Sequence, residues 1–168
     1  MDQDELAARI AQAGDEGSTT LDLSGEGLKY LPPEIGSLTA LSRLDLYRNR
    51  LTALPPEIGN LIALINLRLW SNQLTALPLV IGNLTSLTRL WLQQNHLTVL
   101  PPEIGNLTGL TDLRLTSNRL TALPLEVGNL TSLTELDLSD NQLTALPPEM
   151  KKLIDQGVVK LSGNPLKG

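Results

Sequence analysis

Residues 44–66 read LDLYRNRLTALPPEIGNLIALIN, and the same 23-residue pattern fills six consecutive blocks from residue 21 to residue 158. A seventh block begins at Val159. The fourth block, LWLQQNHLTVLPPEIGNLTGLTD, and the fifth, LRLTSNRLTALPLEVGNLTSLTE, match each other at most positions. Self-similarity at a fixed period is the sequence signature of a solenoid, in which each repeat is one structural unit packed on its neighbours. We therefore expect a repeat architecture.

Each block divides into a short strand, a turn and an outer helical segment. Leu44 and Leu46 alternate with Asp45 and Tyr47, which is the period-two pattern of a strand with one buried face. The two prolines at 55–56 lack backbone donors and have a fixed φ, so they end the strand and favour a helical start. Apolar residues then recur at every third position, which suits a short helical or 3-10 stretch on the outer side.

One asparagine recurs at the same place after each predicted strand. An amide side chain has two donors and an acceptor, so stacked asparagines can bond backbone groups where each strand leaves the sheet. Glu26 stands at this place in the first block, so we expect the ladder to begin in the second block. The predicted ladder consists of Asn49, Asn72, Asn95, Asn118, Asn141 and Asn164.

The pattern LxxLxLxxNxLxxLPxxIGNL, in register from residue 21 to residue 166, resembles the leucine-rich repeat family. The resemblance implies an α/β solenoid: a horseshoe with a parallel β-sheet on its concave face and short helical or 3-10 turns on its convex face. The 23-residue variety is similar to bacterial intracellular arrays, among them the segments that precede GTPase domains in Roco-type proteins. Plant intracellular Ras-group repeats are similar as well.

The repeats predict three parts of the chain: an N-terminal capping helix with its lead-in (1–20), six repeats (21–158) and a seventh partial repeat with the C-terminal end (159–168). An open solenoid exposes a sheet edge at each end, and capping elements cover such edges. A helix over residues 2–13, ended by Gly14 and Gly17, would cover the first edge with Leu6, Ile10 and Ala13 on one face.

The C-terminal edge has less sequence available to cover it. A helix is predicted over 149–156, with Gly157 as its stop, and a last strand over 159–161. Because few residues follow that strand, we expect either a longer parent chain or packing against a partner. Edge-to-edge self-association through the last strand is one form of such packing.

Strands in register bring equivalent positions of successive repeats into columns about 4.8 Å apart. Arginines and aromatic residues concentrate in the outward columns of the middle repeats, although the chain as a whole is acidic. Glu135, Asp137 and Asp140 make the far end of the same surface negative. The candidate partner-binding residues are Arg43, Asp45, Tyr47, Arg68, Trp70, Arg89, Trp91, Gln93, Arg114 and Thr116.

We interpret these columns as a recognition surface for a protein or peptide, because Trp, Tyr and Arg dominate interface energetics. Trp91 between Arg68 and Arg114 predicts an acidic or phosphorylated ligand, bound by stacking and charge-assisted hydrogen bonds. The alternatives are cross-strand pairs that only stabilise the sheet, a glycan stacked on the aromatic residues, and a scaffold or regulatory array of a larger signalling protein such as a Roco-like GTPase.

The composition argues against several other function classes. The chain has no cysteine and shows no metal-ligand cluster or phosphate-binding glycine motif, so we expect no metal, no cofactor, no catalytic residue and no enzyme activity. A net charge of −5 argues against nucleic acid and anionic membranes as partners. The acidic start and the absence of a long apolar run predict a cytoplasmic location.

Overall fold

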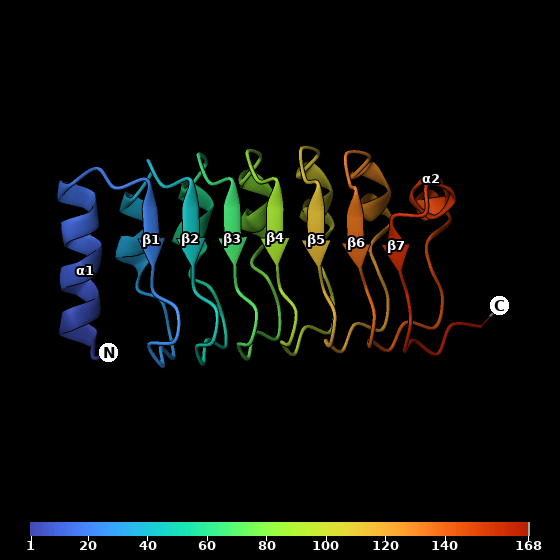
Figure 1. Cartoon of the computed structure of the whole chain (residues 1–168), viewed down its shortest axis with the longest axis horizontal. Coiled ribbons are helices and arrows are strands. Elements are labelled where there is room, and N and C mark those ends of the chain that lie inside the picture. Colours follow the sequence, from blue (N-terminus) through green and yellow to red (C-terminus); the bar gives the residue numbers. More distant parts are fainter. Residues whose placement is uncertain (168) are drawn as a thin grey trace.

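The computed structural model describes residues 1–167 and shows a single parallel sheet of seven short strands arranged in sequence order (Figure 1). Each strand pairs with the next in the register set by the repeat, so that Leu44 faces Leu67. The predicted solenoid with a parallel sheet is therefore confirmed. The strands are β1 (Thr20–Asp22), β2 (Arg43–Asp45), β3 (Asn66–Arg68), β4 (Arg89–Trp91), β5 (Asp112–Arg114), β6 (Glu135–Asp137) and β7 (Val159–Lys160). Gly168, the last position of the predicted partial repeat, lies outside the described residues.

Behind the sheet, each repeat returns through a short 3-10 helix that begins directly after a proline in extended conformation (Figure 1). The recurring leucines and isoleucines, such as Leu44, Ile58 and Leu64, are fully buried between the sheet and these helices. One apolar layer thus runs the length of the array. The 3-10 helices are η1 (Pro33–Ser37), η2 (Pro56–Asn60), η3 (Leu79–Asn83), η4 (Pro102–Asn106), η5 (Leu125–Asn129) and η6 (Pro148–Met150).

The ladder asparagines bond the backbone of two successive repeats. The Oδ1 atom of Asn72 accepts a hydrogen bond from the amide of Leu51 in the preceding repeat, at 3.0 Å. Its Nδ2 atom donates to the carbonyls of Leu46 and Leu69, at 2.9 and 3.0 Å. The same three bonds recur from Asn49 to Asn164. Each side chain therefore satisfies backbone groups that would otherwise be buried without a partner.

A glycine in each of the 3-10 helices η1 to η5 allows neighbouring repeats to approach closely. A Cβ atom built on Gly105 would lie 2.6 Å from the carbonyl oxygen of Glu126 in the next repeat. A Cβ atom on Gly59 would lie 2.7 Å from the Cβ atom of Val80 and 3.1 Å from its carbonyl oxygen. The convex side of the array is therefore packed backbone against backbone at these points.

A left-handed residue follows each full strand and starts the descending turn. The φ angles there are 57° at Arg48, 55° at Ser71, 57° at Gln94, 58° at Ser117 and 54° at Asp140, and glycines hold the equivalent places in the first and last repeats. Residues with a Cβ atom are strained in this region. The repeat geometry imposes this conformation whatever side chain is present.

We expect Ser117→Gly to raise the free energy of unfolding by about 0.5–1 kcal/mol, because glycine adopts this conformation without strain. Urea denaturation followed by circular dichroism measures the change. Ser132→Gly is the matched control, since Ser132 is exposed and does not have a positive φ; it should be neutral or destabilising. A Ser117→Gly protein no more stable than the wild type would contradict the assignment of strain.

The N-terminal edge of the sheet is covered by helix α1 (Gln3–Asp15) (Figure 1). Asp2 caps this helix by accepting a hydrogen bond from the amide of Glu5 at 2.8 Å. Leu6, Ile10 and Ala13 are buried, as predicted. The helix passes Gly14 and continues to Asp15, so that part of the expectation was wrong, whereas Gly17, with φ 60°, directly follows the C-cap Glu16. A Cβ on Gly14 would lie 3.4 Å from Leu38, so Gly14 instead packs against the first repeat from within the helix.

The C-terminal end is covered only in part. Helix η6 runs directly into α2 (Lys151–Asp155), so the helix predicted over 149–156 begins as a 3-10 turn. Gly157, with φ 72°, turns the chain into β7. This strand is shorter than predicted, and Val159 and Leu161 remain half-buried at the edge.

Candidate functional site

The strand register aligns the outward side chains of the concave face of the sheet into three columns. In the first column, Arg43 pairs with Asn66 and Asn66 with Arg89. In the second column, two residues later, Asp45 pairs with Arg68, Arg68 with Trp91, and Trp91 with Arg114. The third column begins two residues later again, and backbone bonds continue there: the amide of Arg48 donates to the carbonyl of Trp70 at 3.0 Å. The candidate residues of the middle repeats therefore lie on one face, as the period predicts.

Trp91 is held on both sides. The guanidinium carbon of Arg68, from β3, lies 4.6 Å from the centre of the indole ring, and that of Arg114, from β5, lies at 4.7 Å. The indole Nε1 donates a hydrogen bond to Asp112 Oδ2 at 2.9 Å. Arginines therefore cover both ring faces, which leaves the ring edge for contact with another molecule.

Tyr47 and Trp70 form the second aromatic element. Their rings stack with centroids 4.5 Å apart and planes 5° from parallel, and the guanidinium of Arg48 lies 4.9 Å from the Trp70 ring. Stacking of two aromatic rings and a cation–π contact with one of them are both attractive interactions. These three side chains consequently form one ordered group beside the Trp91 group.

The arginines differ in what they bind. Arg43 donates two hydrogen bonds to Asp45, at 2.9 and 2.6 Å, and Arg114 donates two to Asp112, at 3.0 and 3.1 Å. Hydrogen bonding to these carboxylates raises the pKa of Arg43 and of Arg114 above its ordinary value. Arg89 contacts the amide oxygen of Asn66 at 3.3 Å. Among residues 1–167, no carboxylate is bonded to the positively charged Arg89.

The far end of the face is negative but largely paired. Glu135 lies 2.8 Å from Lys160 and 3.5 Å from Arg114. Burial raises the pKa of Asp137, but hydrogen bonds from Ser139 and Thr116 outweigh this effect, so the pKa lies below its ordinary value. The Asp137 carboxylate is thus charged at neutral pH.

Two features of the face differ from what the sequence suggested. Asp45 was placed among outward side chains, yet it is only 2% exposed because Arg43 and Arg68 close over it. Gln93 lies between Trp70 and Thr116 in its column, with an Oε1 atom that is buried and has no partner among the described residues. Asp45 therefore lies beneath the surface of the face, whereas Gln93 is half-buried.

Two contributors were missed as site residues. Asp112 orients the Trp91 ring, and Arg48 covers Trp70. The repeat register could have indicated Asp112, because Asp112 lies on β5, the strand next to the one that carries Trp91, and pairs there with Arg89. The position of Arg48 depends on its left-handed backbone, which the sequence pattern does not reveal.

Comparison with known proteins decides the family. A model of the leucine-rich repeat region matches residues 20–114, and a second leucine-rich repeat model matches residues 108–153. The chain belongs to the leucine-rich repeat family. Its general role is therefore that of a protein-interaction module, and arrays of this family are generally not enzymes.

Solved leucine-rich repeat proteins share the fold. A leucine-rich repeat protein of Leptospira interrogans is 38% identical over 94% of this chain, with a TM-score of 0.74. InlP of Listeria monocytogenes is 36% identical over 84% of the chain, with a TM-score of 0.71. The chain spans 46% and 38% of the length of these two proteins. No curated protein matches it.

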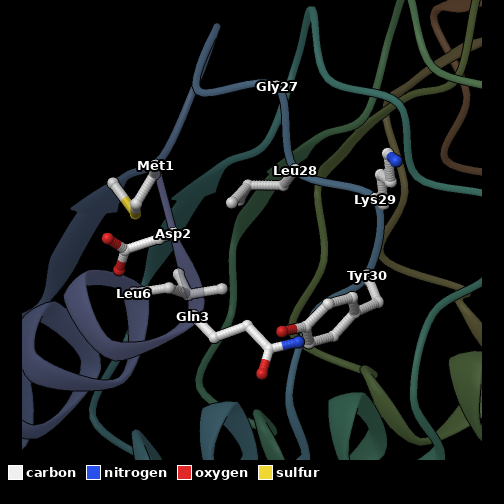
Figure 2. A pocket seen from close by; sticks show the side chains of 8 residues that line it. All are labelled: Met1, Asp2, Gln3, Leu6, Gly27, Leu28, Lys29 and Tyr30. Atoms are coloured by element: carbon white, nitrogen blue, oxygen red, sulfur yellow. The ribbon is translucent and has the colours of Figure 1, made fainter.

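The leucine-rich repeat chain has a separate cavity at its N-terminal end, between the start of α1 and residues 27–30 (Figure 2). Its volume is about 280 Å³, and Leu6 and Leu28 point into it (Figure 2). Tyr30 on its rim is 43% exposed, and the equivalent residue in most other repeats is alanine. Asp2, which also lines the cavity, is already engaged as the cap of α1.

The described residues of the leucine-rich repeat chain offer little for other chemistry. Within residues 1–167, His, Asp and Glu side chains form no group of three placed to hold a metal ion. Neither helix of this part of the chain has the length and apolar content to cross a bilayer.

Proposed function

We propose that this leucine-rich repeat array binds a segment of a partner protein along the concave face of its sheet, and that the segment carries acidic or phosphorylated side chains. The observation that carries the proposal is the set of stacked side chains running from β2 to β5. Tyr47 lies on Trp70, and Trp91 lies between Arg68 and Arg114.

This arrangement favours binding because the large side chains are already ordered. Association normally costs free energy for each rotamer-rich side chain that becomes fixed at an interface. Here Arg68 and Arg114 are fixed against an indole ring, and that ring is fixed in turn by Asp112. Tyr, Trp and Arg also make up most interface hot spots.

The charges favour an acidic segment. Around β3 and β4, the guanidinium groups of Arg48, Arg68 and Arg89 have no carboxylate within hydrogen-bonding distance in the described part of the chain. The two carboxylates of this region, Asp45 and Asp112, are each bonded by an arginine of their own. The middle of the face is therefore positive although the chain carries a net charge of −5.

The test is selection of binding peptides from a random phage-displayed library, with kinase-treated and untreated arms. We expect the selected peptides to be rich in acidic or phosphorylated residues. Trp70→Ala should weaken their binding about 30-fold or more, which corresponds to roughly 2 kcal/mol. The Trp70→Ala/Trp91→Ala double variant should abolish detectable binding. Isothermal calorimetry measures the affinities, and urea denaturation checks that each variant folds.

The matched control is Ile62→Ala, which removes an apolar side chain that is 59% exposed and lies outside the sheet; it should bind like the wild type. Raising the salt concentration should weaken binding of an acidic peptide, because exposed charges are screened. Salt-independent binding of glycans would favour the aromatic residues as a sugar platform. Wild-type affinity in the double variant would refute the proposal.

A further inference from the structure

Two arginines occupy diagonal corners of a square on the middle strands. Asn66 pairs with Arg89, and Arg68 pairs with Trp91, so these four residues form a square on β3 and β4. The guanidinium carbon of Arg68 lies 4.6 Å from the centre of the Trp91 ring, which is about one strand spacing, and Arg89 donates to Asn66 Oδ1 at 3.3 Å. Both guanidinium groups therefore border the square.

The spacing of the square suits one anionic group. Neighbouring strands lie about 4.8 Å apart and two residues rise about 6.6 Å, so the Cα atoms of Arg68 and Arg89 are about 8 Å apart across the diagonal. An anion above the centre of the square lies about 4 Å from each of these two positions. A single phosphate or carboxylate there can be reached by both arginine side chains.

Among the four strand arginines of the middle repeats, Arg43, Arg68, Arg89 and Arg114, the second and third retain the most free donors within residues 1–167. Arg43 and Arg114 each direct two hydrogen bonds at a carboxylate, whereas Arg68 makes no hydrogen bond within residues 1–167. The nearest carboxylate oxygen to Arg68 is Oδ1 of Asp45, at 3.7 Å. A guanidinium group has five N–H donors in a planar fork that matches a carboxylate or phosphate.

Trp91 keeps Arg68 in place. The Arg68 side chain is 25% exposed and lies along the ring. The ring is itself held by the hydrogen bond to Asp112 and by Arg114 on its other face. Asp112 and Arg114 also bind each other, so the support is a closed group of side chains.

We infer that Arg68 and Arg89 form a seat for one oxyanion of the partner, a phosphate monoester or a carboxylate, and that Trp91 positions Arg68 without touching the anion. This inference names the contact point within the surface of the proposed function and rests on it. By this inference, Arg43 and Arg114 stabilise the face through their bonds to carboxylates and do not bind the anion. Asn66 fixes the second arginine, as Trp91 fixes the first.

Titration with inorganic phosphate tests the seat. The ¹⁵N-labelled protein is titrated with sodium phosphate, or with sodium acetate, at pH 7 and a constant ionic strength. Arginine Nε–Hε and tryptophan Nε1–Hε1 resonances report on each side chain. We expect saturable shifts at Arg68, Arg89 and Trp91 with a Kd on the order of millimolar. Saturation with phosphate alone identifies a phosphorylated source, and saturation with both anions shows that a carboxylate is sufficient.

Variants separate the seat from general attraction. Arg68→Gln should weaken phosphate binding about fivefold or more, whereas Arg119→Gln, an exposed arginine with the same change in charge, should have little effect. Trp91→Leu should also weaken binding, and Trp91→Phe, which retains a ring face for Arg68, should restore most of it. A purely structural role would not produce this rescue at equal stability.

Two results would overturn the seat. One is an unsaturable shift spread evenly over all arginines, which would mean diffuse screening. The other is a selected acidic peptide that binds wild type and Arg68→Gln equally well. That second result would leave the proposed function intact. Selection that yields no acidic or phosphorylated peptide would instead refute the proposed function itself.

Discussion

Replacing Asn72 by alanine is expected to lower the free energy of unfolding by about 2–4 kcal/mol. Asn72 is buried, and its Oδ1 atom accepts the hydrogen bond of the buried Leu51 amide. Its removal leaves this amide without its partner, whereas the carbonyls of Leu46 and Leu69 each lose one of two donors and keep Asn49 and Asn95, respectively. Each buried backbone group left without a partner costs about 1–3 kcal/mol. Urea denaturation followed by circular dichroism measures the loss.

The control lies at the next position. Gln73→Ala removes an exposed amide from the same turn and should change stability by less than about 0.5 kcal/mol. Asn72→Asp should be as damaging as the alanine variant, because it presents an acceptor to two carbonyl oxygens. A loss of under about 1 kcal/mol in Asn72→Ala would show that water satisfies these groups.

Gly105→Ala is expected to cost about 2–4 kcal/mol through a clash with backbone. The new Cβ atom would lie 2.6 Å from both the Cβ atom and the carbonyl oxygen of Glu126. Because η5 is anchored by its own buried residues, relief requires separation of η4 from η5. Insertion of a methyl group into tight packing commonly costs about 1–3 kcal/mol, and more where the backbone must shift. Thermal and urea denaturation both report the loss.

Gly109 in the same repeat is a control of the same chemistry. A Cβ on Gly109 would lie 3.7 Å from its nearest neighbour, which is an ordinary contact. Gly109→Ala should therefore be neutral or slightly stabilising, since alanine has less conformational freedom in the unfolded chain. Equal stability of the two alanine variants would mean that the convex turns accommodate an added methyl group without loss of stability.

Most of the fold could be predicted from the period. A residue such as Leu44 recurs every 23 positions, and this spacing alone implies stacked strands and a continuous core. The capping helix followed from an apolar face at Leu6 and Ile10. The end of that helix was wrong at Gly14, because contact with the first repeat outweighs the local preference of glycine to stop a helix.

The site was less predictable than the fold. The period places Trp91 between Arg68 and Arg114, but it carries no information on side-chain torsions or on which carboxylate binds which arginine. The burial of Asp45 beneath Arg43 and Arg68 depends on such side-chain torsions, so the period did not predict it. Which arginine binds which carboxylate depends on competition among several charged neighbours. A repeat pattern describes what the repeats share and contains no information on that competition. Partner binding by these residues and a cytoplasmic location stay predictions.

The stacking of Tyr47 on Trp70 across neighbouring repeats also limits how such an array can evolve. Tandem duplication lengthens a solenoid by whole modules, since each module touches only the two beside it. A module duplicated after residue 135 would leave Tyr47, Trp70 and Trp91 as neighbours. A module inserted between β2 and β3 would separate Tyr47 from Trp70 by one additional strand and abolish the stacking of their rings. Retention of the Tyr47–Trp70 pair therefore constrains the order of the repeats more than their number.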